Sequence, residues 1–414
     1  EHINEFLRRK DCQIVAIVDA DDAVGNARAE DILKKSGKKP VVYKDMREAY
    51  DDKAIDIVSI ATPNHWHALA AIWAIQAGKD VYVEKPVSHN VSEGRRIVEA
   101  ARKHKKIVQT GTQCRSMKGT IDAIEWVKAG KIGECKLARG LCYKPRGSIG
   151  PKGKYDVPAG VDYDLWCGPA PMSPLTRPKL HYDWHCVWQT GYGELGNQGI
   201  HQMDLSRWAL GAECLGHSVQ SYGGRLGYVD AGETANSQVC VHDFGDKTLV
   251  FETRGLKTDA LKGAKVGNIF HGSEGYVVLS GYDRGAAFDL KGEKVKEFLG
   301  NGDHFGNFVN AVRSRKETDL AADIEEGHLS SALCHLGNIS YRLGSMMTLK
   351  DAGAQLSGNA GAAEPFERFA SHLGDNGIDA QGAKISFGPT LTLEGESFTG
   401  ELAKDANPML TREY

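Results

Sequence analysis

A lysine and a histidine far apart in the chain have the residue types and surroundings needed to move a proton. Lys85 directly follows residues 80–83, a mostly apolar, β-branched run that predicts a short buried strand. Pro86 ends this strand, because proline lacks a backbone N–H and keeps the preceding residue out of the helical region. A lysine at the carboxyl end of a parallel strand lies where open α/β sheets bind ligands. A solvated loop lysine explains the spacing of these residues equally well.

His201 lies within residues 196–210, which we predict to be a helix. Asn197, His201 and Asp204 are spaced i, i+4 and i+7, so they share one face of this helix. A histidine beside a carboxylate can move a proton near neutral pH, since the carboxylate sets its tautomer and basicity. The alternative is a core histidine capped by Asp204, although that core face would be unusually polar.

The elements that must position these residues alternate along the first 113 residues. Strand patterns occur at residues 13–18, 41–43, 55–61, 80–83 and 107–109, and helix patterns at 22–36, 68–77 and 92–104. This alternation predicts a doubly wound, mostly parallel α/β sheet of the Rossmann type. Right-handed crossovers place the segments after Asp19, Ala61 and Val83 along one carboxyl edge.

Asp19 ends the strand predicted at residues 13–18. In dinucleotide folds, an acid at this point binds the adenosine ribose hydroxyls, about 20 residues after a glycine-rich turn, and repels a 2′-phosphate. We therefore predict NAD as cofactor and regard NADP as less favoured. The glycine-rich turn would fall at or before residue 1, so we expect the chain to lack the first strand and glycine loop of this domain. A capping role for Asp19 and its acidic neighbours at the next helix is the alternative.

The rest of the chain predicts an α+β domain with an open, mostly antiparallel sheet. Strand patterns occur at residues 136–143, 218–223, 237–244, 248–253, 268–271 and 276–279, and helix patterns at 120–129, 305–313 and 321–343. We expect an NAD-binding domain at residues 1–113, a substrate and oligomerisation domain at 114–351, and a C-terminal extension at 352–414.

Aromatic and basic side chains are concentrated in the Gly- and Pro-rich stretch ahead of His201. Aromatic faces with a few hydrogen-bonding groups suit a sugar ring, although these residues could simply fill a loop-rich interface. The predicted substrate contacts are Tyr143, Arg146, Trp166, Tyr182 and His185. His181 and His185 lie four residues apart, but no third ligand has a diagnostic spacing, so we expect no metal site.

Composition argues against several other classes of function. The formal net charge of -3 gives no electrostatic reason to expect nucleic acid or an anionic membrane as partner. No window approaches the roughly 18 apolar residues of a membrane-spanning helix. The nine cysteines include no CxxC pair, which argues against a disulfide framework or a zinc site built from cysteines. No Gly-x-Ser-x-Gly motif supports serine hydrolase chemistry.

Three motifs together resemble the Gfo/Idh/MocA oxidoreductase family. They are Ala-Thr-Pro-Asn-His-Trp-His at residues 61–67, Val-Glu-Lys-Pro at 83–86, and the glycine-rich run at 191–204. The resemblance implies a dinucleotide-binding domain, followed by a domain whose open sheet joins copies into a homo-oligomer. Residues 164–171 are similar to family members that often carry an export signal, so both a cytoplasmic and a periplasmic location stay open.

The resemblance also implies roles for single residues. Lys85 matches the family lysine beside the nicotinamide and the substrate hydroxyl, and His201 matches the catalytic histidine. The family often has aspartate where this chain has Asn197, which cannot take up a proton, so Asp204 or Glu194 would supply the charge instead. We predict catalytic roles for Lys85, His201, Asn197 and Asp204, and cofactor contacts for Asp19, Thr62, Asn64, His67, Glu84, Lys85 and Gln113.

The predicted activity is hydride transfer between NAD and a secondary alcohol of a sugar, sugar acid or cyclitol. His201 would take the hydroxyl proton while Lys85 polarises the oxygen. Two alternatives stay open: a redox-neutral glycoside-cleaving enzyme that retains NAD, and a non-catalytic sugar-binding protein. The expected partners are a small carbohydrate or cyclitol and further copies of the chain, with neither nucleic acid nor membrane.

Overall fold

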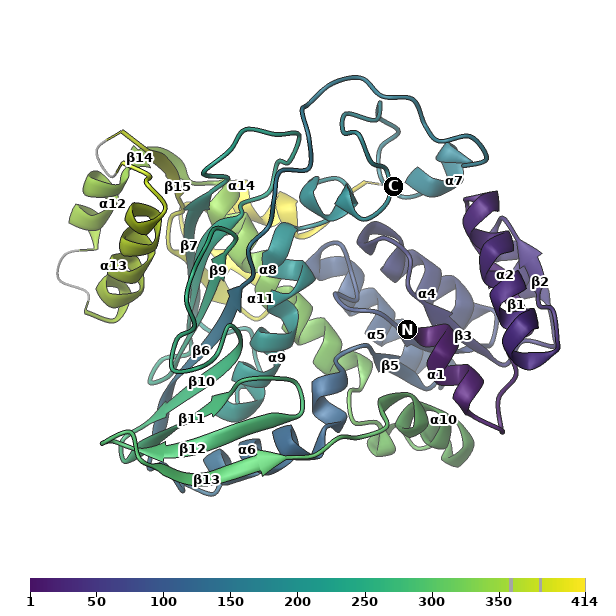
Figure 1. The fold of residues 1–414 in the computed structure, drawn as a ribbon, viewed down its shortest axis with the longest axis horizontal. Coiled ribbons are helices and arrows are strands. Elements are labelled where there is room, and N and C mark those ends of the chain that lie inside the picture. The colour runs from purple at the N-terminus through teal and green to yellow at the C-terminus, as the bar shows by residue number, and fades with distance from the viewer. Residues whose placement is uncertain (357–359, 380–381, 414) are drawn as a thin grey trace.

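The computed structural model describes residues 1–356, 360–379 and 382–413. Figure 1 shows a smaller N-terminal group of strands and a larger C-terminal sheet, with helices between them. The N-terminal strands are β1 (Ala16–Val18), β2 (Val41–Tyr43), β3 (Ile57–Ile60), β4 (Asp80–Val83) and β5 (Val108–Thr110). The helices around them are α1 (His2–Arg8), α2 (Asp22–Ser36), α3 (Met46–Asp51), α4 (His67–Gln76) and α5 (Val91–His104).

Local sequence explains where these helices begin and end. The carboxylate of Asp21 accepts the backbone N–H of Ala23 at 2.9 Å and begins α2. Gly37 ends α2 with φ of 74°, a conformation that glycine adopts without strain. Asn90 caps α5 in the same way, by accepting the N–H of Glu93. The helix predicted at residues 22–36 is therefore confirmed to the residue.

All strand pairs in the N-terminal group are parallel. β1 pairs with β2, while β3, β4 and β5 pair in that order. Within the described residues no strand joins β1 to β3, so the sheet is in two pieces. In a doubly wound sheet the position between these two strands belongs to the first strand of the domain. The predicted α/β class is confirmed, and the carboxyl ends of β3, β4 and β5 share one edge.

The C-terminal sheet is mixed and mostly antiparallel, as expected. Its order is β13-β12-β11-β10-β6-β9-β8-β7-β15-β14, and the pair β6 and β9 is parallel. The main strands are β6 (Cys135–Tyr143), β7 (Ser218–Gly224), β8 (Ser237–Asp243), β9 (Thr248–Arg254), β10 (Val266–Gly272), β11 (Gly275–Leu279), β12 (Arg284–Asp289) and β13 (Lys294–Leu299). The later strands are β14 (Ser345–Thr348), β15 (Lys384–Phe387), β16 (Leu391–Glu394) and β17 (Ser397–Thr399).

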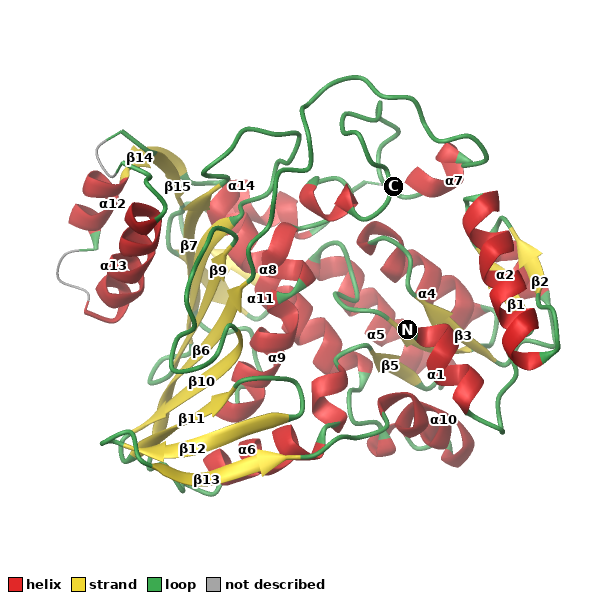
Figure 2. Cartoon of the chain, viewed as in Figure 1, coloured by secondary structure: helices red, strands yellow, loops and turns green. Residues whose placement is uncertain are grey.

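Helices cover both faces of this sheet, as Figure 2 shows. The inner face, toward the N-terminal group, packs against α6 (Lys118–Lys128), α9 (Gly199–Leu210) and α11 (Ile324–Arg342). The outer face at β7 to β9 packs against α12 (Leu349–Gln355) and α13 (Ala360–Asp375). The other helices named below are α7 (Tyr163–Cys167), α8 (Gly193–Asn197) and α10 (His304–Ser314). No helix among the described residues is long and apolar enough to span a membrane.

The structure differs from three expectations about these elements. The helix predicted at residues 196–210 is broken at Gln198 into α8 and α9, in a run whose glycines weaken a continuous helix. β12 and β13 were not predicted, because both are short and lack an apolar run, and β13 at the edge of the sheet is largely exposed. The segment predicted as an extension contributes β15 and β16, which both pair with β7. Residues 357–359, 380–381 and 414 of that segment lie outside the described residues.

A buried ionic cluster holds α13 on the outer face of the sheet. Glu252 on β9 pairs with Arg139 and Arg254 from the sheet and lies 3.3 Å from Arg368 on α13. Burial would raise the pKa of Glu252, but the charges of these arginines outweigh it and lower the pKa to about 2. Because Glu252 is charged and pairs with Arg368, it helps to fix the position of α13, in addition to the apolar contacts beneath this helix.

Replacing Phe369 tests how far α13 contributes to stability. Phe369 is 1% exposed and packs against Tyr222 on β7. We expect Phe369→Ala to lower the free energy of unfolding by about 3–5 kcal/mol, since it leaves a cavity beneath α13. Exposed Glu367→Ala on the same helix should change it by less than about 0.5 kcal/mol. Chemical unfolding followed by circular dichroism measures both, and a loss below about 1 kcal/mol for Phe369→Ala would contradict the packing.

Candidate active site

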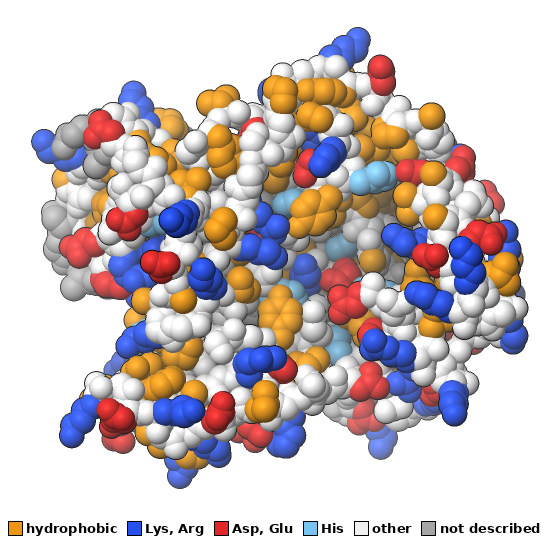
Figure 3. Space-filling view, viewed as in Figure 1, with side chains coloured by type: hydrophobic (Ala, Val, Ile, Leu, Met, Phe, Trp, Pro, Cys, Tyr) orange, Lys and Arg blue, Asp and Glu red, His pale blue; other side chains and the backbone are white. Residues whose placement is uncertain are grey.

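Lys85 lies at the junction of the two groups of strands. It follows β4, the central strand of its piece of parallel sheet, and its Nζ donates a hydrogen bond of 2.9 Å to the backbone carbonyl of Asn197 on α8. This contact joins two segments that are 112 residues apart in the sequence. Figure 3 shows this face of the molecule hollowed between the two groups of strands, with histidine side chains in the hollow.

His201 is buried at the start of α9 and close to Lys85. Burial and, to a smaller extent, the charge of Lys85 lower the pKa of His201 to about 3, against the opposing charge of Glu84. Its Nδ1 has no hydrogen-bond partner within the protein, and its ring lies 5.0 Å from the ring of Tyr282. The site therefore holds a neutral imidazole with an open nitrogen beside a lysine.

Glu84 supplies a fixed negative charge next to Lys85. Its carboxylate accepts hydrogen bonds from His2 Nε2 at 3.0 Å and from the backbone N–H of Lys85 at 3.2 Å. Burial would raise the pKa of Glu84, but the bond from His2 and the charge of Lys85 outweigh it and lower the pKa to about 2. Gly111 packs directly against this carboxylate, since a Cβ there would lie 2.7 Å from Oε1.

His67 ties the loop after β3 to the loop that carries Lys85. Its Nδ1 lies 2.6 Å from the carbonyl oxygen of Pro86, and its Nε2 lies 2.8 Å from that of Thr62. Both ring nitrogens thus face backbone carbonyls and neither is open to a ligand. His67 was predicted as a cofactor contact. In the structure it instead contacts the carbonyl of Pro86, the residue next to Lys85, and so helps to position the lysine.

The other predicted cofactor residues lie at the carboxyl ends of the parallel strands. Among the described residues, three of their buried polar atoms have no hydrogen-bond partner: Thr62 Oγ1, Asn64 Nδ2 and Gln113 Oε1. Asp19 follows β1, and burial raises the pKa of its carboxyl. Buried polar groups normally have hydrogen-bond partners, so these three unpartnered atoms are suited to bind a polar ligand such as a nicotinamide cofactor.

Asn197 and Asp204 do not flank His201 as the helical spacing predicted. Asn197 gives its backbone carbonyl, rather than a side-chain group, to Lys85. Asp204 accepts two hydrogen bonds from Arg115 Nε, at 3.0 and 2.8 Å, and one from Ser330 at 2.8 Å. The break at Gln198 places Asn197 on α8, apart from His201, whereas Asp204 stays on α9 with His201 but faces Arg115. Asp204 therefore links α9 to α11 and Arg115.

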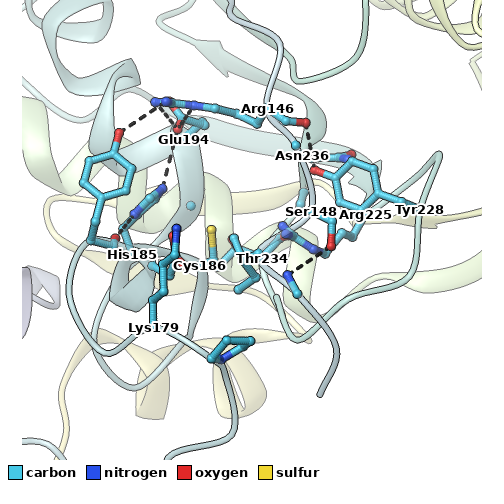
Figure 4. Close-up of a pocket in the computed structure, with 18 residues that line it drawn as sticks. Arg146, Ser148, Lys179, His185, Cys186, Glu194, Arg225, Tyr228, Thr234 and Asn236 are labelled. Carbon is cyan, nitrogen blue, oxygen red and sulfur yellow. Dashed lines mark hydrogen bonds and ion pairs between the residues drawn. The ribbon is translucent and has the colours of Figure 1, made fainter. Parts of the chain in front are cut away.

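Three of the predicted substrate residues line one cavity of about 420 Å³, shown in Figure 4. They are Arg146, Tyr182 and His185. Glu194 on α8 also lines it, lying 2.7 Å from Arg146 Nη2 and 3.7 Å from His185 Nε2. Among the described residues, no group of three His, Cys, Asp or Glu side chains could hold a metal ion.

The other two predicted substrate residues lie elsewhere. Tyr143 on β6 donates its hydroxyl to Glu252 at 2.6 Å, within the ionic cluster beneath α13. Side chains alternate along a strand, so Tyr143 faces outward while Cys142 faces Glu194. Trp166 is buried in a small separate core and stacks on Tyr163. For Trp166, this matches the alternative in which the aromatic residues only fill a loop-rich interface.

Three residues at the site were not found from the sequence: Gln198, Tyr282 and His304. Tyr282 lies in the turn between β11 and β12 and accepts a hydrogen bond of 2.8 Å from Gln198 Nε2. His304, at the start of α10, donates a hydrogen bond from its Nε2 to the carbonyl of Thr110, 2.9 Å away. No motif spacing points to them, since β12 was unpredicted and Gln198 lay inside a predicted helix.

A long covering segment, residues 155–190, crosses from the C-terminal sheet to the carboxyl edge of the parallel strands (Figure 1). His181 Nε2 lies 2.9 Å from a carboxylate oxygen of Asp21, beyond β1. Trp66, before α4, donates its indole N–H to the carbonyl of Leu165 at 3.0 Å. The segment thus contacts the loops after both β1 and β3, where the cofactor residues were predicted.

Comparison with known proteins agrees with this fold. A family model described as "Oxidoreductase family, NAD-binding Rossmann fold" matches residues 1–112, and one described as "Oxidoreductase family, C-terminal alpha/beta domain" matches residues 147–233. Both models describe domains of the Gfo/Idh/MocA oxidoreductase family, so these two segments of the chain are similar to that family. The resemblance predicted from the three motifs is confirmed, as is the assignment to an NAD-binding fold.

Two curated relatives are similar to part of the chain. The chain is 31% identical over 137 residues to an alpha-N-acetylgalactosaminidase of Shewanella oneidensis, covering 32% of this chain and 30% of that protein. It is 30% identical over 132 residues to an inositol 2-dehydrogenase of Salmonella typhimurium, covering 32% of this chain and 38% of that one. The aligned region thus spans roughly a third of the length of these relatives.

Solved structures share the fold over most of the chain. The WlbA dehydrogenase of Bordetella pertussis, in complex with NADH and UDP-GlcNAcA, has a TM-score of 0.59 at 18% identity and covers 80% of this chain and 89% of its own. An NAD binding oxidoreductase of Klebsiella pneumoniae has a TM-score of 0.59 at 20% identity, with 80% and 91% covered. At this identity the likeness establishes the architecture alone.

The lowered pKa of His201 predicts a specific loss of stability in acid. The unfolded chain binds a proton at this histidine below about pH 6.5, whereas the folded chain does not, so the contribution to stability is lost as pH falls. Between pH 7.5 and 5.5 this loss amounts to about 1.4 kcal/mol.

We expect His201→Gln to reduce the fall in unfolding free energy between these two pH values by that amount. Exposed His104→Gln on α5 serves as the control for replacing a histidine. Urea unfolding at both pH values measures the difference. An unchanged pH dependence in His201→Gln would contradict a neutral, buried imidazole.

Proposed function

We propose that the protein transfers hydride between NAD and a secondary alcohol of a sugar, sugar acid or cyclitol. The observation that supports this most is the position of Lys85 at the tip of β4, bonded to the carbonyl of Asn197 and close enough to the neutral imidazole of His201 on α9 to lower its pKa. A base that is unprotonated at neutral pH, next to a hydrogen-bond donor, is what removal of a hydroxyl proton requires. The related inositol 2-dehydrogenase and WlbA dehydrogenase are named for reactions of this general kind.

The cofactor would be held at the carboxyl edge of the parallel strands. Asp19 is proposed to bind its adenosine ribose, and Thr62, Asn64 and Gln113 to bind its nicotinamide end through their unfilled polar atoms. When bound there, NAD supplies the hydride acceptor. The carboxylate of Glu84 would favour a cationic ring nearby and hold the charge of Lys85 in place.

The chain's own residues would then manage the proton. A ring nitrogen of His201 takes the proton from the substrate hydroxyl, and Lys85 donates a hydrogen bond to the same oxygen. Tyr282 holds the imidazole from one side through ring contact. Burial of this site excludes water and strengthens each of these interactions.

Replacing the two central residues tests the proposal. Lys85→Ala and His201→Ala should each lower kcat/KM by about 100-fold or more, because each removes a group that acts on the reacting oxygen. NADH formation at 340 nm with myo-inositol, hexoses and hexuronates measures turnover. Lys103→Ala, an exposed lysine on α5, is the matched control. Near-normal turnover in both site variants would refute the assignment.

A redox-neutral glycoside-cleaving enzyme that retains NAD is the second candidate. The covering segment favours it, since contacts at Asp21 and Trp66 close over both loops proposed to bind the cofactor. A cofactor that stays bound must regain its starting oxidation state within one catalytic cycle, so hydride taken from a sugar would return to the same sugar. The related alpha-N-acetylgalactosaminidase is named for glycoside cleavage.

Cofactor retention separates the two candidates. If the second is correct, purified protein should carry a stoichiometric amount of NAD through gel filtration and release it only on denaturation. His181→Ala and Trp66→Phe should then release it faster, because each removes a contact of the covering segment, whereas His104→Ala should not. Rapid exchange with free NAD in the unaltered protein would favour the dehydrogenase. Sugar-induced stabilisation without any effect of NAD would instead favour a non-catalytic sugar-binding protein.

Association of copies through the C-terminal sheet is also proposed, on the family resemblance. Helices α12 and α13 cover the outer face at β7 to β9. Copies would therefore meet through the part of the sheet beyond these helices.

A further inference from the structure

The cavity lined by Arg146, Tyr182 and His185 borders the proposed reaction site without including Lys85 or His201. We propose that this cavity binds a second sugar ring, so that the substrate is an uncharged two-ring glycoside whose other ring lies beside Lys85. The inference rests on the proposed function of the Lys85 and His201 site and adds the substrate class that the site accepts.

Helix α8 forms a wall common to the cavity and the reaction site. Gly193 and Glu194, in its first turn, line the cavity, while the carbonyl of Asn197 accepts the hydrogen bond from Lys85 at 2.9 Å. Residues three apart on a helix are neighbours within one turn of about 5.4 Å. A ligand that fills the cavity therefore lies about one helical turn from Asn197, whose carbonyl accepts the hydrogen bond from Lys85.

The arginines in the cavity wall are already neutralised. Arg146 lies 2.7 Å from the carboxylate of Glu194, and Arg225 binds Asp230 through two hydrogen bonds of 2.5 and 2.6 Å. A charge that is paired in this way is not available to attract an anionic ligand. Lys179 and Asp183, which also line the cavity, have opposite signs. The lining therefore favours a neutral, polar ligand over a sugar phosphate or uronic acid.

The polar atoms of the lining suit hydroxyl groups. Thr234 is 1% exposed and its Oγ1 has no partner within the protein, yet the residue lines the cavity. The Nδ1 of His185 faces the backbone carbonyl of Tyr182 and so carries the proton, which leaves Nε2 as an acceptor on the side of Glu194. A sugar hydroxyl can both donate and accept, and so could satisfy either group.

Two tyrosines provide flat surfaces beside these polar atoms. Tyr182 is 59% exposed and lines the cavity, as does Tyr228, whose hydroxyl donates to the carbonyl of Arg146 at 3.2 Å. The C–H faces of a pyranose ring pack well on aromatic rings, whereas its hydroxyls need the polar groups between them. A volume of about 420 Å³ lies within the usual range for a small-molecule site.

Calorimetric titration of the purified protein tests this subsite. Lactose, cellobiose and maltose are compared with galactose, glucose and myo-inositol, and we expect at least one two-ring sugar to bind more tightly than each single-ring compound. Thr234→Val, which exchanges a hydroxyl for a methyl group of similar size, should weaken binding of that two-ring sugar by about 2- to 10-fold. Binding of the single-ring compounds should not change.

Thr253→Val is the matched control, since Thr253 is 2% exposed and also has an unpartnered hydroxyl, but lies on β9 outside the cavity. Equal effects of the two substitutions would overturn the proposal, as would single-ring compounds that bind as tightly as every two-ring sugar. Tighter binding of glucuronic acid or glucose 6-phosphate would overturn the neutral ligand class. If the protein binds the two-ring sugar but transfers no hydride from it to NAD, the proposed function is rejected and the subsite is retained.

Discussion

The hydrogen bond from Lys85 to the carbonyl of Asn197 is the contact on which the arrangement of the site depends. It fixes the tip of a central parallel strand against the first helix of the segment that carries His201. A flexible lysine side chain has many conformations in isolation, and this bond selects one of them. Because His67 holds the next peptide through Pro86, the lysine is constrained from both its ends.

Burial around this contact sets the charge of each group. His201 is neutral because an imidazolium there would lose its hydration and lie beside a lysine. Glu84 is charged because His2 and Lys85 compensate for its burial. Burial therefore disfavours the charged form of both groups, which lie far apart in the sequence, and the nearest charges decide which of them stays ionised. A base, a donor and a fixed negative charge result at this one site.

Elements far from the chemistry hold this enclosure together. Asp204 and Arg115 join α9 to its surroundings by a buried ion pair, and Ser330 on α11 completes it. The covering segment closes the edge of the parallel strands, and α13 is fixed to the outer sheet face by the cluster around Glu252. Buried ion pairs contribute little net stability, but removing one partner leaves an uncompensated charge. They therefore specify one relative position of the packed elements.

The sequence by itself determined the fold class, the bounds of local elements such as α2 and β4, and the two residues, Lys85 and His201, that the structure brings together. Apolar periodicity, capping residues and strand-ending motifs are local, so they can be interpreted without knowing any partner. Only the tertiary structure decided the side to which each residue turns and what it meets there. Asp204 turned to Arg115, Tyr143 faced away from the site, and Tyr282 reached His201 from an unpredicted hairpin. Spacing specifies a face of a helix or strand, whereas the partner on that face is set by packing between segments a hundred residues apart.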